Sequence, residues 1–212
     1  MRVVAFNGSP SNKGNTAEAL RMVLGELEKE NIETELIHVG AQQVQGCIAC
    51  HMCARNRDER CVLQGDDVNL WIQKMKQADG IIFGSPTHFA GMSATMKAFM
   101  DRAFYVAGNN GGLFRLKPAA AIAAVRRSGG VPAFDAMNRY IQYSEMFLVG
   151  SNYWNVIHGA LPGEAGNDEE GAQIMSILGQ NMAWLLNVLE DGKKAHLAPE
   201  RTRKKKMNFI RK

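Results

Sequence analysis

The sequence predicts an α/β protein built on one doubly wound parallel sheet. Short apolar runs rich in β-branched residues alternate with longer amphipathic stretches along most of the 212 residues, a pattern typical of parallel strands covered by helices. A chain of 212 residues is shorter than the length at which hydrophobic cores usually divide. The hydrophobic fraction of 46% and the charged fraction of 22% exclude a collagenous or wholly disordered chain. We therefore expect one globular domain.

Five strands and five helices are predicted in strict alternation. The strands are expected at residues 3–6, 33–39, 80–84, 118–125 and 146–149. The helices are expected at residues 15–30, 67–77, 93–105, 132–143 and 168–191. The second predicted strand alternates between a more polar and a more apolar face, which favours an edge position. The third is continuously apolar and is expected at the centre. Periodicity alone does not separate the strand orders 2-1-3-4-5 and 3-2-1-4-5, but five strands fit 2-1-3-4-5 better.

The predicted domain covers residues 1–192, and residues 193–212 form a basic tail. The tail holds nine of the 25 Lys and Arg residues and one of the 21 acids, so the rest of the chain carries a formal charge of −4. A basic tail can bind nucleic acid or anionic lipid, but a solvated terminus without a specific nucleic acid partner is expected. Because no apolar run is long enough for a secretory signal or a membrane span, we expect a cytoplasmic protein.

Three loops follow neighbouring strands at their carboxyl ends, where a doubly wound sheet binds its ligands. The first, residues 8–16 (GSPSNKGNT), offers hydroxyl groups and backbone N–H groups at a helix start, which suits a phosphate. It lacks the order of Gly and Lys that nucleotide-binding P-loops need. An ordinary turn with Asn15 or Thr16 as helix cap remains the alternative. The second loop is residues 84–93 (GSPTHFAGMS), and the third is residues 126–130 (RRSGG).

All four cysteines lie in the segment 40–66, which is expected to be a loop insertion, as is the segment 150–167. Their spacing is C-x2-C-x2-C-x7-C, with metal-ligand candidates Cys47, Cys50, Cys53 and Cys61. Four thiolates are the ligands that a 4Fe-4S cluster needs, although free redox-active thiols and zinc remain alternatives. Gly46 is expected to supply an unusual backbone angle, His51 to be a bystander, and the charged stretch 55–60 to face solvent.

The first two loops resemble elements of the flavodoxin-like NAD(P)H-dependent FMN reductase family. The GSPR-x-x-GNT loop of that family matches residues 8–16 with Ser11 in place of its Arg, a second match is the S-P-x-Y/H-x-x-x-x-S stretch at residues 85–93, and the resemblance extends from Met1 to about Asp191. It implies an FMN phosphate bound by Ser9, Ser11, Lys13, Asn15 and Thr16. The resemblance also implies that residues of the other two loops line the flavin ring and the ribityl chain: Pro86, Thr87, His88, Phe89, Gly91, Met92, Ser128 and Gly129.

The cysteine spacing resembles that of the iron-sulfur flavoproteins, a branch of the same family, although simple flavin reductases also carry cysteine-bearing loops. The resemblance implies an FMN-dependent oxidoreductase, in which the flavin carries the chemistry and no side-chain nucleophile is needed. With a cluster, its partners would be a ferredoxin-like donor and two-electron acceptors such as quinones. Without a cluster, NAD(P)H would reduce the flavin directly. A non-enzymatic flavodoxin-type electron carrier is the alternative.

The resemblance further implies a homodimer or homotetramer. The apolar side chains of Phe147, Tyr153 and Trp154 near the fifth predicted strand would be unusual exposed surface on a monomer.

Overall fold

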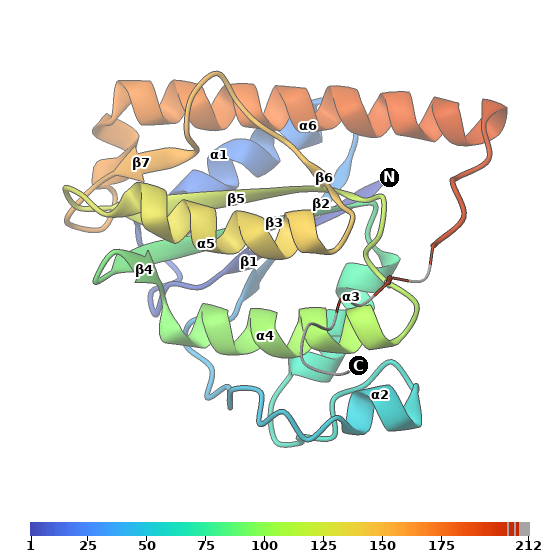
Figure 1. The fold of residues 1–212 in the computed structure, drawn as a ribbon. Coiled ribbons are helices and arrows are strands. Elements are labelled where there is room, and N and C mark those ends of the chain that lie inside the picture. Colours follow the sequence, from blue (N-terminus) through green and yellow to red (C-terminus); the bar gives the residue numbers. More distant parts are fainter. Residues whose placement is uncertain (203, 206, 208–212) are drawn as a thin grey trace.

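The computed structural model describes residues 1–202, 204, 205 and 207 of the chain. It has three layers, with a central sheet between helices on both faces (Figure 1). The strands are β1 (Arg2–Asn7), β2 (Glu33–His38), β3 (Gly80–His88), β4 (Gly91–Met92), β5 (Pro118–Val125), β6 (Phe147–Leu148) and β7 (Val156–His158). The helices are α1 (Asn15–Lys29), α2 (Met52–Asn56), α3 (Val68–Gln77), α4 (Ala94–Asn109), α5 (Gly130–Tyr143) and α6 (Glu169–Ala195), with a 3-10 turn at Glu164–Asn167.

The strands follow the order β2-β1-β3-β5-β6, and these pairs are all parallel. Because β4 is only a short antiparallel extension of β3, this is the doubly wound, flavodoxin-like order 2-1-3-4-5 that the sequence favoured. The predicted edge strand β2 lies at the edge, and β3 lies at the centre with its first six residues buried. All eight residues of β5 are buried as well, as expected for a strand covered on both faces.

Two hydrophobic clusters cover the two faces of the sheet. On one face α1 and α6 pack together through Leu20, Val23, Leu178 and Met182. On the other face α3, α4 and α5 bring in aromatic and long apolar side chains, among them Trp71, Phe99, Met137 and Ile141. The alanines of β5 leave room for helices to approach the sheet closely.

The fifth strand position differs from the expectation. One strand was predicted at residues 146–149, but β6 pairs with the start of β5 and β7 pairs with its end. Between them lies the buried Asn155. Its side-chain amide nitrogen donates to the Ala121 carbonyl at 3.1 Å, and its backbone carbonyl accepts from the Ala123 N–H. The Asn155 side chain therefore replaces a backbone partner in the gap between β6 and β7. No local sequence pattern predicts this contact.

The two segments expected to be loops contain short regular elements. The segment 40–66 holds the single-turn helix α2, and the segment 150–167 holds β7 and the 3-10 turn. These elements are too short to show a periodic apolar pattern. In the basic tail, helix α6 continues to Ala195, and residues 203, 206 and 208–212 lie outside the described residues. Among the residues with described structure, no helix has the length and apolarity needed to cross a membrane.

Candidate flavin site and cysteine cavity

The loop after β1 is held by its own short side chains. The Asn7 side chain accepts from the Ser9 N–H at 3.0 Å, and the hydroxyl of Ser9 accepts from the Ser11 N–H at 3.1 Å. Ser11 in turn accepts from the Lys13 N–H at 3.3 Å. These bonds fold the loop back over the start of α1, so the hydroxyl groups and the helix N-terminus face one small region.

Helix α1 begins after Gly14, and no side chain among the described residues caps it. The alternative of Asn15 or Thr16 as helix cap is therefore wrong: the Asn15 side-chain oxygen accepts instead from the Ala165 N–H at 3.1 Å, and Thr16 is buried in the first turn. The first-turn N–H groups of α1 remain available for an acceptor, and the positive end of the helix dipole favours an anion there.

Two buried serines join the first loop to the second. The Ser85 hydroxyl accepts from the Ser93 N–H at 2.8 Å, and the Ser93 hydroxyl donates to the Gly8 carbonyl at 2.7 Å. Ser93 also caps α4 by accepting from the Met96 N–H. The ends of β1 and β3 and the start of α4 therefore form one connected unit at the carboxyl edge of the sheet.

The second loop is a strained hairpin. Thr87 pairs with Met92 and His88 with Gly91, which leaves Phe89 and Ala90 as a two-residue turn. Both have positive φ, 49° and 58°, as in the turns that usually carry Asn-Gly, at a cost of about 1–2 kcal/mol each for residues with a side chain. Phe89 is fully exposed, while the Thr87 hydroxyl is buried and has no hydrogen-bond partner among the described residues. Strain and an unpaired buried hydroxyl at a loop tip are typical of a ligand site.

The third loop packs against this hairpin. Gly129 has a φ of +85°, and a Cβ atom there would lie 3.0 Å from the Ala90 Cα atom and 3.3 Å from the Thr87 side chain. Ser128 and Gly129 also line a cavity of about 230 Å³, together with Tyr153, Trp154 and His158. The structure thus brings all three predicted loops to one edge of the sheet.

The four cysteines line one small cavity of about 20 Å³ beside α4, together with His51 and Tyr105. Cys53 is buried, Cys61 is partly buried, and Cys47 and Cys50 are exposed. Burial raises the pKa of the Cys53 thiol; a backbone hydrogen bond at Ala54 opposes this, and the charges of Cys61 and Cys47 raise it further. Among the described residues, no three His, Cys, Asp or Glu side chains are placed to hold a single metal ion. A cubane cluster instead spreads its cysteine ligands over four corners, which suits a cavity lined by four thiols.

The backbone of the cysteine segment is strained in places that the sequence did not suggest. Gly46 was expected to adopt an unusual angle, but Ala49 and His51 have positive φ instead, 52° and 58°. These residues alternate with the cysteines, so the strained positions turn the chain around the cavity. His51 Nδ1 and the Tyr105 hydroxyl form a hydrogen bond of 2.9 Å. As expected, most of the stretch 55–60 is exposed.

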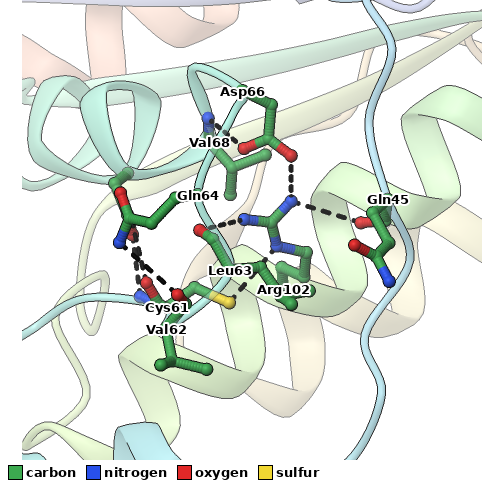
Figure 2. A network of polar contacts seen from close by, with 9 residues as sticks. Gln45, Cys61, Val62, Leu63, Gln64, Asp66, Val68 and Arg102 are labelled. Carbon is green, nitrogen blue, oxygen red and sulfur yellow. Dashed lines mark hydrogen bonds and ion pairs between the residues drawn. The ribbon is translucent and has the colours of Figure 1, made fainter.

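A buried arginine of α4 contacts this segment, and sequence reasoning missed it. Arg102 donates from Nε to the Cys61 sulfur at 3.3 Å and from its terminal nitrogens to the carbonyls of Gln45 and Leu63, and it forms an ion pair with Asp66 (Figure 2). Burial would lower the pKa of Arg102, but the hydrogen bonds to Asp66 and Cys61 outweigh it and raise that pKa. The signal was present, because Arg102 follows Phe99 by three residues and so falls on the apolar stripe of its helix.

The sequence profile of the NADPH-dependent FMN reductase family matches residues 1–160. The chain belongs to this family. The family consists of flavin-dependent oxidoreductases.

Several known proteins are similar to this FMN reductase family member. An iron-sulfur flavoprotein of Methanocaldococcus jannaschii is 33% identical over 201 residues, which cover 90% of this chain and 100% of the relative. A solved flavodoxin from the domain Archaea shares the fold with a TM-score of 0.59, 17% identity, and coverage of 88% and 99% of the two chains. The NAD(P)H:quinone oxidoreductase from Methanothermobacter marburgensis gives a TM-score of 0.61 at 16% identity, with coverage of 86% and 96%.

The predicted flavin residues of this family member differ in what they contact. Ser9, Ser11, Thr87 and Gly129 lie in the hydrogen-bonded loops, whereas the Asn15 side-chain oxygen is taken by Ala165. Pro86 is partly buried, and Lys13, His88, Phe89 and Ser128 are exposed. Ser85 and Ser93 were not among the predicted site residues. The signal for Ser93 was present, because a serine directly before an apolar helical run is a recognisable helix cap.

Proposed function

We propose that this protein is an FMN-dependent oxidoreductase that also holds a 4Fe-4S cluster in its cysteine cavity. The observation that carries the proposal is that four cysteines from two stretches of chain line one cavity against α4, the helix whose first residues are bonded to the loop after β1. A relative that matches along its whole length is named an iron-sulfur flavoprotein. FMN would supply two-electron chemistry and the cluster one-electron chemistry when both are bound.

The residues of the first loop suit the FMN phosphate. The hydroxyls of Ser9 and Ser11, the first-turn N–H groups of α1 and the exposed Lys13 side chain are donors around one region. A helix start without a side-chain cap is suited to one terminal phosphate. Thr16, buried in the first turn, and the amide nitrogen of Asn15 complete the proposed set.

The flat ring suits the surface between the second and third loops. The unpaired Thr87 hydroxyl offers a hydrogen bond, and Gly129 allows the backbone to come within contact distance of the hairpin. Pro86, His88, Phe89, Gly91 and Met92 form the remainder of the proposed ring contacts, with Ser128 at the mouth of the adjoining cavity.

Helix α4 connects the two proposed cofactor sites. Ser93 at its start bonds the Gly8 carbonyl, and Arg102 in its middle bonds the Cys61 sulfur. Nine residues of α-helix separate them by roughly 14 Å along the axis. One helix therefore contacts both proposed sites, and the proposed role is to pass electrons from a one-electron donor, of the ferredoxin type, to a two-electron acceptor such as a quinone, with NAD(P)H as the alternative donor.

The test is an absorption spectrum of anaerobically purified protein, with flavin, iron and acid-labile sulfide measured per chain. One FMN with four irons and four sulfides is the expected result. Flavin without iron and with four titratable thiols would reduce the proposal to a simple NAD(P)H-dependent flavin reductase. Absence of turnover with NAD(P)H, reduced ferredoxin and quinones would favour the flavodoxin-type carrier.

Replacement of Asn15 and Thr16 by leucine tests the phosphate loop. Flavin retention is expected to be lost, because bulky apolar side chains block the helix start. The control is Asn181→Leu on the exposed face of α6, which should keep its flavin. Full FMN occupancy in the double variant would contradict the assignment.

We also propose a homodimer or homotetramer. Phe147, Tyr153 and Trp154 are all exposed in the single chain, which supports an interface at the edge of the sheet. Light scattering at micromolar concentration should return a multiple of the 23.4 kDa chain mass, and the monomer mass would rule the assembly out.

A further inference from the structure

Arg102 is the most deeply buried charged side chain in contact with the cysteine cavity. Its side chain has 0% exposure, and its ion-pair partner Asp66 has 5%. By contrast, the arginines within the cysteine segment, Arg55, Arg57 and Arg60, are exposed to water. Water and salt screen exposed charges strongly and buried charges weakly. Arg102, which donates to the Cys61 sulfur, is therefore screened less than the exposed arginines of the segment.

The contacts of Arg102 join the two ends of the cysteine segment. The Gln45 carbonyl precedes the first three cysteines, while Cys61, Leu63 and Asp66 belong to the return stretch (Figure 2). A guanidinium group has several donors in a rigid fork, so one side chain can fix both stretches. Lysine has no such fork.

Cys61 is the cysteine that most needs such a contact. The other three follow one another at intervals of three residues, whereas Cys61 comes eight residues after Cys53. Its backbone is fixed by Asn69 of α3, which accepts from the Cys61 N–H at 2.7 Å and donates to the Cys61 carbonyl at 2.9 Å. Its sulfur is contacted by Arg102 Nε. Two helices thus set the position of the backbone and of the sulfur separately.

We propose that Arg102 is a positioning residue that holds the Cys61 sulfur toward the other three cysteines and raises the reduction potential of a cluster bound there. This inference rests on the proposed function for its cluster part. A hydrogen bond and a positive charge at a ligand sulfur stabilise the more negative, reduced state of an iron-sulfur cluster. The same contact keeps the return stretch in place before a cluster is present.

The experiment compares full-length Asp66→Asn with the double variant Asp66→Asn/Arg102→Met. Removing Arg102 alone would leave a buried, unpaired carboxylate and endanger folding. The two variants both lack that carboxylate and differ only at Arg102, whose guanidinium keeps its bonds to Cys61, Gln45 and Leu63 in Asp66→Asn. Arg57→Gln, which removes an exposed charge from the same segment, is the second control. Flavin, iron and sulfide per chain are measured, and the cluster potential is followed by electron paramagnetic resonance during a redox titration.

The double variant is expected to keep its FMN, to lose iron to a chelator faster than Asp66→Asn, and to show a more negative cluster potential. Arg57→Gln should match the unmodified protein. Equal potentials and equal iron retention in the double variant and Asp66→Asn would overturn the proposal.

A measurement on cluster-free protein separates this inference from the proposed function. If the unmodified chain binds no iron, the proposed cluster is refuted, and amide hydrogen exchange then decides the role of Arg102. Exchange at the Cys61 amide should be about tenfold faster in the double variant than in Asp66→Asn, the effect expected from loss of a charged hydrogen bond. Equal exchange rates would overturn the positioning role as well.

Discussion

Gly40 lies two residues after β2 and packs against the proposed phosphate loop. Adding one methyl group there therefore tests the loop without changing any of its own residues. A Cβ atom at residue 40 would lie 2.1 Å from the Ser9 carbonyl oxygen and 2.5 Å from the Gly8 carbonyl carbon. Both are backbone atoms, and the Ser9 carbonyl is also held by the His38 ring at 2.7 Å. Since Cβ contacts under 3.0 Å essentially never occur, the loop or the end of β2 must move by about 0.9 Å.

Overpacking of this kind costs about 1–3 kcal/mol. If the loop moves, the cost appears in flavin binding, and Gly40→Ala should weaken FMN about 10- to 100-fold, because 1.4 kcal/mol corresponds to a factor of ten. If β2 moves, the cost appears in the free energy of unfolding. Quenching of flavin fluorescence on titration of the flavin-free protein gives Kd, and urea denaturation gives the stability.

The control is Gly25→Ala in α1, where a Cβ atom would meet nothing within 4 Å. It should stabilise the protein by about 0.5–1 kcal/mol, because alanine favours a helix interior over glycine, with Kd unchanged. Gly40→Ala with wild-type Kd and wild-type stability would refute the reasoning, since the methyl group would then fit without displacing the loop.

Three further predictions follow from single contacts. Gly129→Ala should weaken FMN about tenfold or more, because its φ of +85° and its approach to Ala90 both oppose a side chain; an unchanged Kd would contradict this. Cys61→Ser should lose iron but keep FMN, as measured by metal and flavin analysis, and full iron content would exclude Cys61 as a ligand. Asp168→Ala removes the carboxylate that caps α6 and accepts from the His158 N–H, and should destabilise the protein by about 1 kcal/mol at neutral pH. Burial opposes ionisation of Asp168, but hydrogen bonds from Gly171 and His158 outweigh it and lower the pKa of Asp168. The stabilisation by the carboxylate is therefore fully present above the ordinary pKa of aspartate, and it is lost as the pH falls through the lowered pKa of the folded protein. Urea titrations at pH 7 and pH 3 should show the difference shrinking in acid, and an equal difference at both would refute it.

The sequence by itself determined the layers and favoured the strand order that the structure has. Continuous apolar runs at residues 80–84 and 118–125 could only be strands buried on both faces, and the wetter strand at 33–39 had to lie at an edge. Local chemistry also placed the three loops, because a strand followed by Gly and Ser and then a helix is readable over a few residues. Every one of these inferences depends on neighbours within about a dozen residues in the chain.

Tertiary structure decided how those pieces meet. The division of the fifth strand position depends on Asn155 bonding the edge of β5, a contact between residues 34 apart in the chain. The alternative of Asn15 as a helix cap is excluded by a bond that its side-chain oxygen accepts from the Ala165 N–H, 150 residues away. Arg102 reaches Cys61, Gln45 and Asp66 across separations of 41, 57 and 36 residues. Hydrophobic periodicity does not predict contacts of such polar side chains. Whether each of them is buried and paired depends on which distant segment packs against it in the folded chain.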